Sequence, residues 1–172
     1  MKNILTIIIL LITLSSMFSQ TKLDSVVFEK VNEYRISKGF KSLGWDITCY
    51  KAAKVHTNYL FRTGKVGHKE DTLVDPKDRL RYVDSKGKWT IINEVAISTN
   101  INIKDDSIDK IAILIVNGWK NSKLHNDVIL DSVSLFSGVE CILKIRPQGL
   151  KDVYNYQVIS TMVIVGGIYR NL

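Results

Sequence analysis

The spacing of apolar and polar positions predicts two amphipathic helices at the start of the folded chain. From Leu23 to Lys38, apolar residues recur every three to four positions, and Gly39 offers the left-handed backbone that ends a helix. A second helix is expected over 47–63, where Asp46 can cap the first turn and Gly64 can end the last one. The expected core-facing positions are Leu23, Val26, Val27, Val31 and Tyr34 in the first helix, and Ile47, Tyr50, Ala53, Thr57, Leu60 and Phe61 in the second.

The middle of the chain is polar and irregular from 65 to 90. Asp75 and the proline after it can start one short helical turn that runs through Arg81. The next apolar segment, 91–98, is short and carries a single carboxylate, Glu94. A carboxylate among apolar residues needs a partner if it is buried, because an unpaired interior charge is costly.

The last part of the chain predicts one more helix and two strands. A helix is expected over 107–119, capped by Asp105 or Asp106, with Trp119 packing in the core. The β-branched segments 135–145 and 155–169 flank a turn at 146–150, which predicts an antiparallel hairpin. Helices first and paired strands last indicate an α+β fold, with helices packed on a small antiparallel sheet.

The N-terminus has the pattern of a secretory signal peptide. Lys2 precedes an apolar run over 4–14, and small and polar residues follow it. A retained anchor is the alternative, but the run is shorter than the roughly 20 residues that a membrane-spanning helix needs. We therefore expect residues 1–19 to be removed, residues 20–172 to form one secreted, periplasmic or extracellular domain, and no membrane span to remain after cleavage.

Charge and cysteine content narrow the classes of function. The net charge of +7 becomes +6 when Lys2 leaves with the signal peptide. The basic residues occur singly, without the dense run and interleaved aromatic residues of a nucleic-acid interface, so a nucleic-acid partner is not expected. Cys49 and Cys141 could form one disulfide, worth roughly 4–5 kcal/mol for so long a loop, or stay as two buried free thiols. The sequence leaves both alternatives open.

Several stretches, taken in order, carry a resemblance to a known family. They are VNEYRISKGFKSLGWD, KAAKVHTNYL, GKVGHKED, INEVAIS, VNGWKNSKLHNDVIL, FSGVEC and the final strand. Together they resemble the CAP superfamily (cysteine-rich secretory, antigen 5 and pathogenesis-related 1 proteins) in its short bacterial form, over a core of about 26–165. This resemblance implies a three-layer α-β-α sandwich.

The same resemblance implies a ligand cleft. His68, Glu94 and His125 match the two cavity histidines and the signature glutamate, and His56 matches a position outside the cavity set. The chain departs from the family pattern beside Glu94, at Asn93 and Val95, and in lacking the many cysteines of the animal proteins. It also has Ser122 where larger members place a second glutamate.

The chemistry of these residue types allows more than one function. Two histidines and a glutamate suit zinc or a similar divalent ion, with His68 and His125 as the candidate metal ligands, although no HExxH spacing places two ligands on one helix face. Ser122 could be a nucleophile with His125 as its base, but its position better fits a helix cap. His56 is expected to be a helix-surface residue or a satisfied core residue.

We therefore expect a secreted, non-enzymatic module that binds a ligand or partner in a cleft of His68, Glu94, Ser122 and His125. The resemblance implies a lipid, a sterol or an envelope component as the partner, and zinc is a possible but not a required cofactor. Two alternatives stay open at this point. One is an endopeptidase or other hydrolase that uses His68, Glu94 and His125, and the other is a structural envelope protein whose histidines pair with Glu94.

Overall fold

The structure is a computed structural model that describes residues 21–103, 107–146 and 154–170. The expected signal peptide, the expected Asp105 or Asp106 cap and most of the expected 146–150 turn lie outside these residues. The described elements, in chain order, are α2 (Lys22–Ser37), β1 (Gly44–Trp45), α3 (Ile47–Thr63), α4 (Pro76–Val83), β2 (Gly87–Ile103), α5 (Ile108–Asn121), α6 (Lys123–Ile129), β3 (Phe136–Ile145) and β4 (Tyr154–Arg170).

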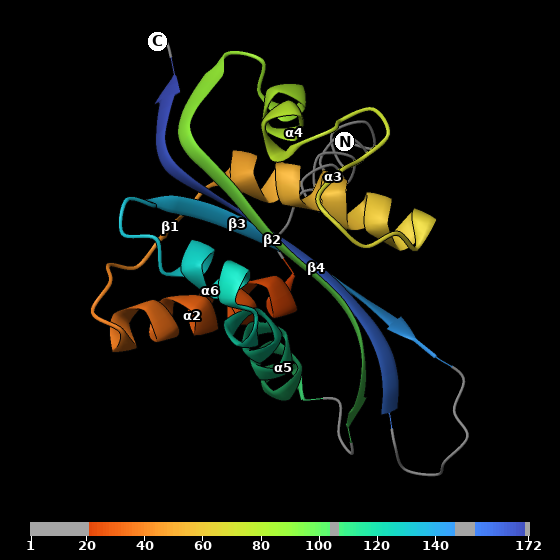
Figure 1. Cartoon of the computed structure of the whole chain (residues 1–172). Helices are drawn as coiled ribbons and strands as arrows, with labels where there is room; N and C mark the ends of the chain where they lie inside the picture. The colour runs from red at the N-terminus through yellow and green to blue at the C-terminus, as the bar shows by residue number, and fades with distance from the viewer. Residues whose placement is uncertain (1–20, 104–106, 147–153, 171–172) are drawn as a thin grey trace, which may run out of the picture.

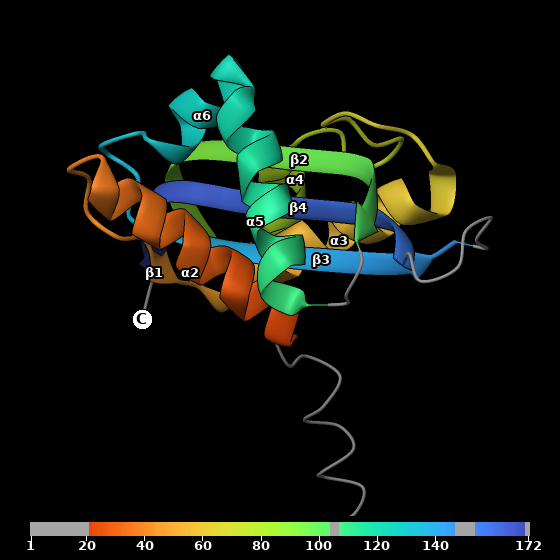
Figure 2. The ribbon, with the colours of Figure 1, turned by 90° about the horizontal axis from the view of Figure 1, so that it is seen from below.

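These elements form three layers (Figure 1). The sheet has the order β1-β3-β4-β2, and its long strands pair antiparallel around β4. Helices α2, α5 and α6 cover one face of the sheet, and α3 and α4 cover the other, as Figure 2 shows from below. The predicted α+β sandwich is confirmed. The sheet is mixed rather than purely antiparallel, because β1 pairs in parallel with β3 over two residues.

Local signals for helix ends operate as the sequence predicts. Oδ1 of Asp46 accepts hydrogen bonds from the backbone N–H groups of Thr48 and Cys49, at 2.8 and 2.9 Å, which satisfies two donors that the first turn of α3 leaves free. Gly64 ends α3 with φ +67°. Asp75 forms a capping box at the start of α4. Cap chemistry depends on a few neighbouring residues, which is why the sequence alone identifies it.

Strand β4 is central and is buried on both faces. Met162 and Ile164 belong to the core beneath α2, α5 and α6, whereas Val163 and Val165 belong to the core beneath α3 and α4. Such a strand reads as a continuous apolar run. Strand β2 extends well beyond the predicted 91–98, because its pairing with β4 continues through polar positions that show no apolar signal.

The two cysteines are free thiols on opposite sides of the sheet. Cys49 lies in α3 within the core beneath α3 and α4, and Cys141 lies on β3 within the other core. A sheet therefore separates the two thiols, and the disulfide alternative is not realised. Among the described residues, no helix is both long and apolar enough to cross a membrane.

Candidate functional site

His68, Glu94 and His125 lie together in space although they are far apart in the sequence. Nδ1 of His68 lies 3.0 Å from Oε1 of Glu94, and the His68 and His125 ring centres are 6.0 Å apart at an interplanar angle of 75°. The side chain of His68 is 47% exposed, whereas that of Glu94 is 1% exposed. The expected convergence is observed, and a binding role for these residues stays a prediction.

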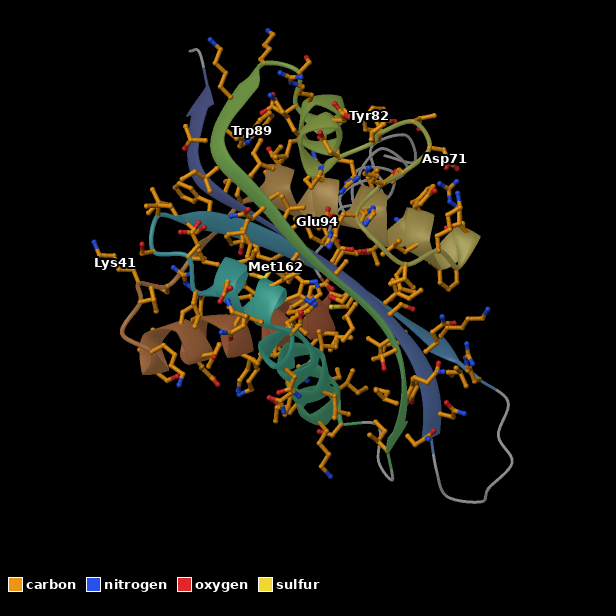
Figure 3. All side chains as sticks on the ribbon, viewed as in Figure 1. Lys41, Asp71, Tyr82, Trp89, Glu94 and Met162 are labelled. Carbon is orange, nitrogen blue, oxygen red and sulfur yellow. The ribbon has the colours of Figure 1, made fainter. Side chains whose placement is uncertain are left out.

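The position of β2 explains how both helix layers reach this place. Glu94 pairs with Val163, so its side chain points toward the α3 and α4 layer (Figure 3). His68 comes from the segment between α3 and α4, on that same side. His125 comes from α6, in the opposite layer, which also contacts β2. Because β2 is at the edge of the described sheet, side chains from both layers can meet around it.

His56 lies beside these residues in α3. Its ring is fully buried, which agrees with the satisfied core residue that was one of its two expected roles. Nδ1 lies 2.8 Å from Oε1 of Glu70, and Nε2 lies 2.8 Å from the carbonyl oxygen of Gly67 and 3.5 Å from Oε1 of Glu94. The Gly67 carbonyl can only accept, so Nε2 donates to it, and one proton lies between Nδ1 and the Glu70 carboxyl group.

Arg79, from α4, is a buried cation that sequence reasoning missed. Its Nη2 donates to Oε2 of Glu94 at 2.6 Å, and its Nη1 lies 3.4 Å from Oε1 of Glu70. The signal that could have found it is general: a carboxylate buried in an apolar strand requires a cation, and Arg79 precedes the fully buried Leu80 in the capped helix.

The polar groups of this cluster pair with one another. Two nitrogen-bearing side chains, His56 and Arg79, face two acidic side chains, Glu70 and Glu94, and all four are at most 5% exposed. Each acidic group contacts both His56 and Arg79, so none of the four groups is left alone in the interior. We call these four residues the buried cluster. Its outer boundary is His68, the exposed imidazole that donates to Glu94.

His125 and Ser122 lie at the start of α6. Burial, and then the charge of His68, holds the pKa of His125 below the ordinary histidine value. Ser122 occupies the N-cap position, as expected, but its hydroxyl makes no capping hydrogen bond. In the described part of the chain, no hydrogen bond joins Ser122 to His68, Glu94 or His125. The pairing of a serine nucleophile with a base is therefore not present.

A divalent ion needs ligand atoms that lie close together and are not already hydrogen-bonded. One ligand atom each from His56, His68 and Glu94 lies within 4.8 Å of the other two. However, both nitrogens of His56 lie within hydrogen-bond distance of protein oxygens, and each oxygen of Glu94 accepts a hydrogen bond or ion pair. These atoms are not free to bind a metal. The remaining candidate ligands are the imidazoles of His68 and His125, whose ring centres are 6.0 Å apart, and imidazole is a ligand that zinc prefers.

Two hollows in the surface lie away from the imidazole pair. One, of about 310 Å³, lies between α2 and α5. The other, of about 550 Å³, lies between α3 and α4, and Glu70 forms part of its lining. Neither is lined by His68, Glu94 or His125. The second hollow touches the buried cluster through Glu70.

Comparison with known proteins supports the fold described above. The family described as "CAP: Cysteine-rich secretory protein family" matches residues 28–143, and no curated protein matches the sequence. An extracellular protein with an SCP domain from Bacillus anthracis is 20% identical, with a TM-score of 0.60. An outer surface protein from Borrelia burgdorferi is 18% identical (TM-score 0.61), and a cysteine-rich secretory protein from Staphylococcus aureus is 16% identical (TM-score 0.51).

The extent of these matches differs. The chain is covered over 83%, 89% and 84% of its length by the Bacillus, Borrelia and Staphylococcus proteins, respectively. It spans 40% of the Bacillus protein and 38% of the Staphylococcus protein, but 97% of the Borrelia protein. The identities are low, so these structures bear on the fold. The family match covers most of the chain and every element from α3 to α6, and the chain therefore belongs to the cysteine-rich secretory protein, or CAP, family.

Proposed function

We propose that this protein is a secreted, non-enzymatic CAP module that binds a ligand or partner at His68, Glu94 and His125. Residues 1–19 are its signal peptide, and residues 20–172 are the mature domain. The observation that carries the proposal is the hydrogen bond from Nδ1 of His68 to the buried Glu94. This bond orients a half-exposed imidazole, and the ring centre of His125 lies 6.0 Å from that of His68.

The proposed ligand has a group that two neutral imidazoles can hold. A zinc ion fits this description, with His68 and His125 as its ligands and Glu94 as the residue that orients His68. When bound, the ion would supply a positive charge and open coordination positions for a further ligand. The lowered pKa of His125 favours the neutral ring that metal binding requires. Ser122, half-buried at the start of α6, belongs to the wall of this site in the proposal.

Apolar residues next to both histidines suit a ligand with an apolar part, such as a lipid or a sterol. Val66, two residues before His68, is 70% exposed, and Leu124, directly before His125, is 77% exposed. The setting is the cell envelope or the space outside it. The signal-peptide pattern supports this, as does the description of two structural neighbours as extracellular and outer-surface proteins. A net charge of +6 on the mature chain favours contact with anionic envelopes.

Binding experiments on residues 20–172 test the proposal. Isothermal titration with zinc chloride, and co-sedimentation with phosphatidylglycerol vesicles with and without cholesterol, would be compared for wild type, His125→Gln and Lys123→Gln. Lys123 is the matched control because it lies on the same helix and is 87% exposed. We expect His125→Gln to weaken binding at least tenfold and Lys123→Gln to leave it unchanged. Equal affinity in all three proteins, or no binding of either probe, would refute the proposal.

A hydrolase is the second candidate, favoured by one observation. Glu94 and His68 have the arrangement of an orienting acid and a general base, with Nε2 of His68 free to take a proton from water. Purified wild type and His68→Gln would be incubated with a broad peptide library. Turnover that disappears in His68→Gln would favour the hydrolase, and equal residual turnover in the two proteins would exclude it.

A further inference from the structure

The geometry points to Arg79 as the positioning residue of the His68 site. This inference rests on the proposed binding function, in which His68 needs a fixed orientation. The guanidinium of Arg79 holds both the backbone of the segment that carries His68 and the Glu94 carboxylate that orients the His68 ring. Nothing in the general shape of the CAP fold requires both contacts to come from a single side chain.

Arg79 contacts this segment at three places. Nη1 donates to the carbonyl oxygen of Leu73 at 3.0 Å, and Nη2 donates to the carbonyl oxygen of His68 at 3.2 Å. Nη1 also lies 3.4 Å from Oε1 of Glu70, which is between them in the sequence. The fourth contact is the 2.6 Å hydrogen bond from Nη2 to Oε2 of Glu94. The guanidinium therefore donates hydrogen bonds both to the backbone of His68 and to Glu94, the acid that hydrogen-bonds the His68 ring.

The other side-chain contacts of the segment are at the surface, where Lys65 bonds the Tyr59 hydroxyl at 3.2 Å and Asp71 at 3.0 Å. Between Gly64 and Asp75, Glu70 is the one buried residue, and Val66 and Val74 are exposed. The segment contains no helix or strand, and its internal backbone hydrogen bond, from Glu70 to Val74, is long at 3.4 Å. Since apolar burial does not fix this segment, buried polar contacts must do so.

His56 completes the attachment from the opposite helix. It donates to the carbonyl oxygen of Gly67, Arg79 donates to the next carbonyl oxygen, that of His68, and both side chains lie near Oε1 of Glu70. His56 and Arg79 therefore hold the backbone at 67 and 68 from α3 and α4. A guanidinium suits the α4 position because it presents several donors in one plane. An ammonium group at that position would supply the charge without the geometry.

The consequence is a single neutral form of the His68 ring. With Glu94 fixed, Nδ1 carries the proton and Nε2 offers its lone pair to the ligand. NMR of the ring nitrogens distinguishes this tautomer from the Nε2–H tautomer. The measurement is made at about pH 8.5, well above the ordinary histidine pKa of about 6.5. The chain has three histidines, so His125→Gln together with the burial of His56 assigns each signal.

The test compares wild type with Arg79→Met, Arg79→Lys and Arg81→Met. Arg81 is the matched control because it is an exposed arginine two residues further along α4. We expect the Nδ1–H tautomer of His68 in wild type and in Arg81→Met. In Arg79→Met and Arg79→Lys we expect at least a fivefold shift toward the Nε2–H tautomer. Zinc affinity should fall about 10- to 100-fold in both Arg79 variants, as for other residues that orient a metal ligand.

A purely structural role of Arg79 predicts a different result. Arg79→Lys would then restore thermal stability and the tautomer together, and this outcome would overturn the proposal. An Nε2–H tautomer in wild type would also overturn it, without any variant. If Arg79→Met does not fold, Arg79→Lys still carries the test, since its charge remains beside Glu94. A tautomer shift without zinc binding in any protein would leave Arg79 as the positioning residue and remove zinc from the proposed function.

Discussion

Replacing Glu94 by glutamine should destabilise the protein strongly although the side chain keeps its shape. Glu94 has 1% of its side chain exposed, and its carboxylate contacts the buried Arg79 and His56. In Glu94→Gln, the buried guanidinium of Arg79 loses its 2.6 Å ion pair and keeps only the 3.4 Å contact with Glu70, an acid that His56 already contacts at 2.8 Å. Breaking a buried ion pair on one side costs about 3–5 kcal/mol. For a domain of this size, that corresponds to a fall in Tm of about 6–20 °C.

Urea unfolding followed by tryptophan fluorescence measures this loss, because the chain has three tryptophans. Glu33→Gln is the matched control. Glu33 also forms an ion pair at 3.0 Å, with Lys30, but its side chain is 64% exposed. We expect the urea midpoint of Glu33→Gln to match that of wild type, since exposed pairs contribute little. Equal urea midpoints for Glu94→Gln and Glu33→Gln would refute the argument that the buried cluster depends on the charge of Glu94.

Three further predictions concern other buried or half-buried groups. Burial raises the pKa of Glu140, so its ionisation opposes folding as pH rises through that pKa. Glu140→Gln should therefore be more stable than wild type at pH 7 and equally stable at about pH 3, as urea unfolding at both values would measure. Cys49 and Cys141 should react with a thiol reagent in urea but not in the folded protein, and dithiothreitol should not lower Tm. Burial, and then the charge of His68, lowers the pKa of His125, so an NMR titration should place it below about 6.5, and His68→Gln should raise it.

Most helices of this fold were predictable because their ends depend on local chemistry. The expected helix over 47–63 coincides with α3, and Asp46 and Gly64 act as its cap and its stop. The prediction of which α3 residues face the core is less accurate. Ile47 and Phe61, both expected to face inward, are 45% and 40% exposed. These two residues lie at the ends of α3, and periodicity does not show where the sheet beneath a helix stops.

For the strands, too, the sequence pattern predicts the buried core but not how far pairing extends. β4 was predictable from its apolar run, because it is covered on both faces. β2 is longer than its apolar segment, since its length is set by pairing with β4 rather than by its own side chains. β1 has two residues and no detectable period, so Gly44 and Trp45 were expected to form only a link. Their pairing with β3 makes the sheet mixed.

For the candidate site, the sequence indicated the exposed members better than the buried ones. His68, Glu94 and His125 were expected together from the resemblance to CAP proteins, and they are together. The resemblance places His56 outside this set, and Arg79 lies in a polar segment where most arginines are exposed. The partner that a buried Glu94 requires indicates that a cation lies nearby, but it does not indicate which one.

The sequence by itself determined where helices begin and end, which two segments form the paired strands at the end of the chain, and that Glu94 would need a partner if buried. These properties follow from caps, periodicity and the cost of burying a charge, all of which act within a few residues. The tertiary structure alone decided which side chains neutralise Glu94 and which side of the sheet each thiol faces. Charge pairing in the interior is chosen by distance in space, and residues 56, 70, 79 and 94 become neighbours only when α3, α4 and β2 pack together.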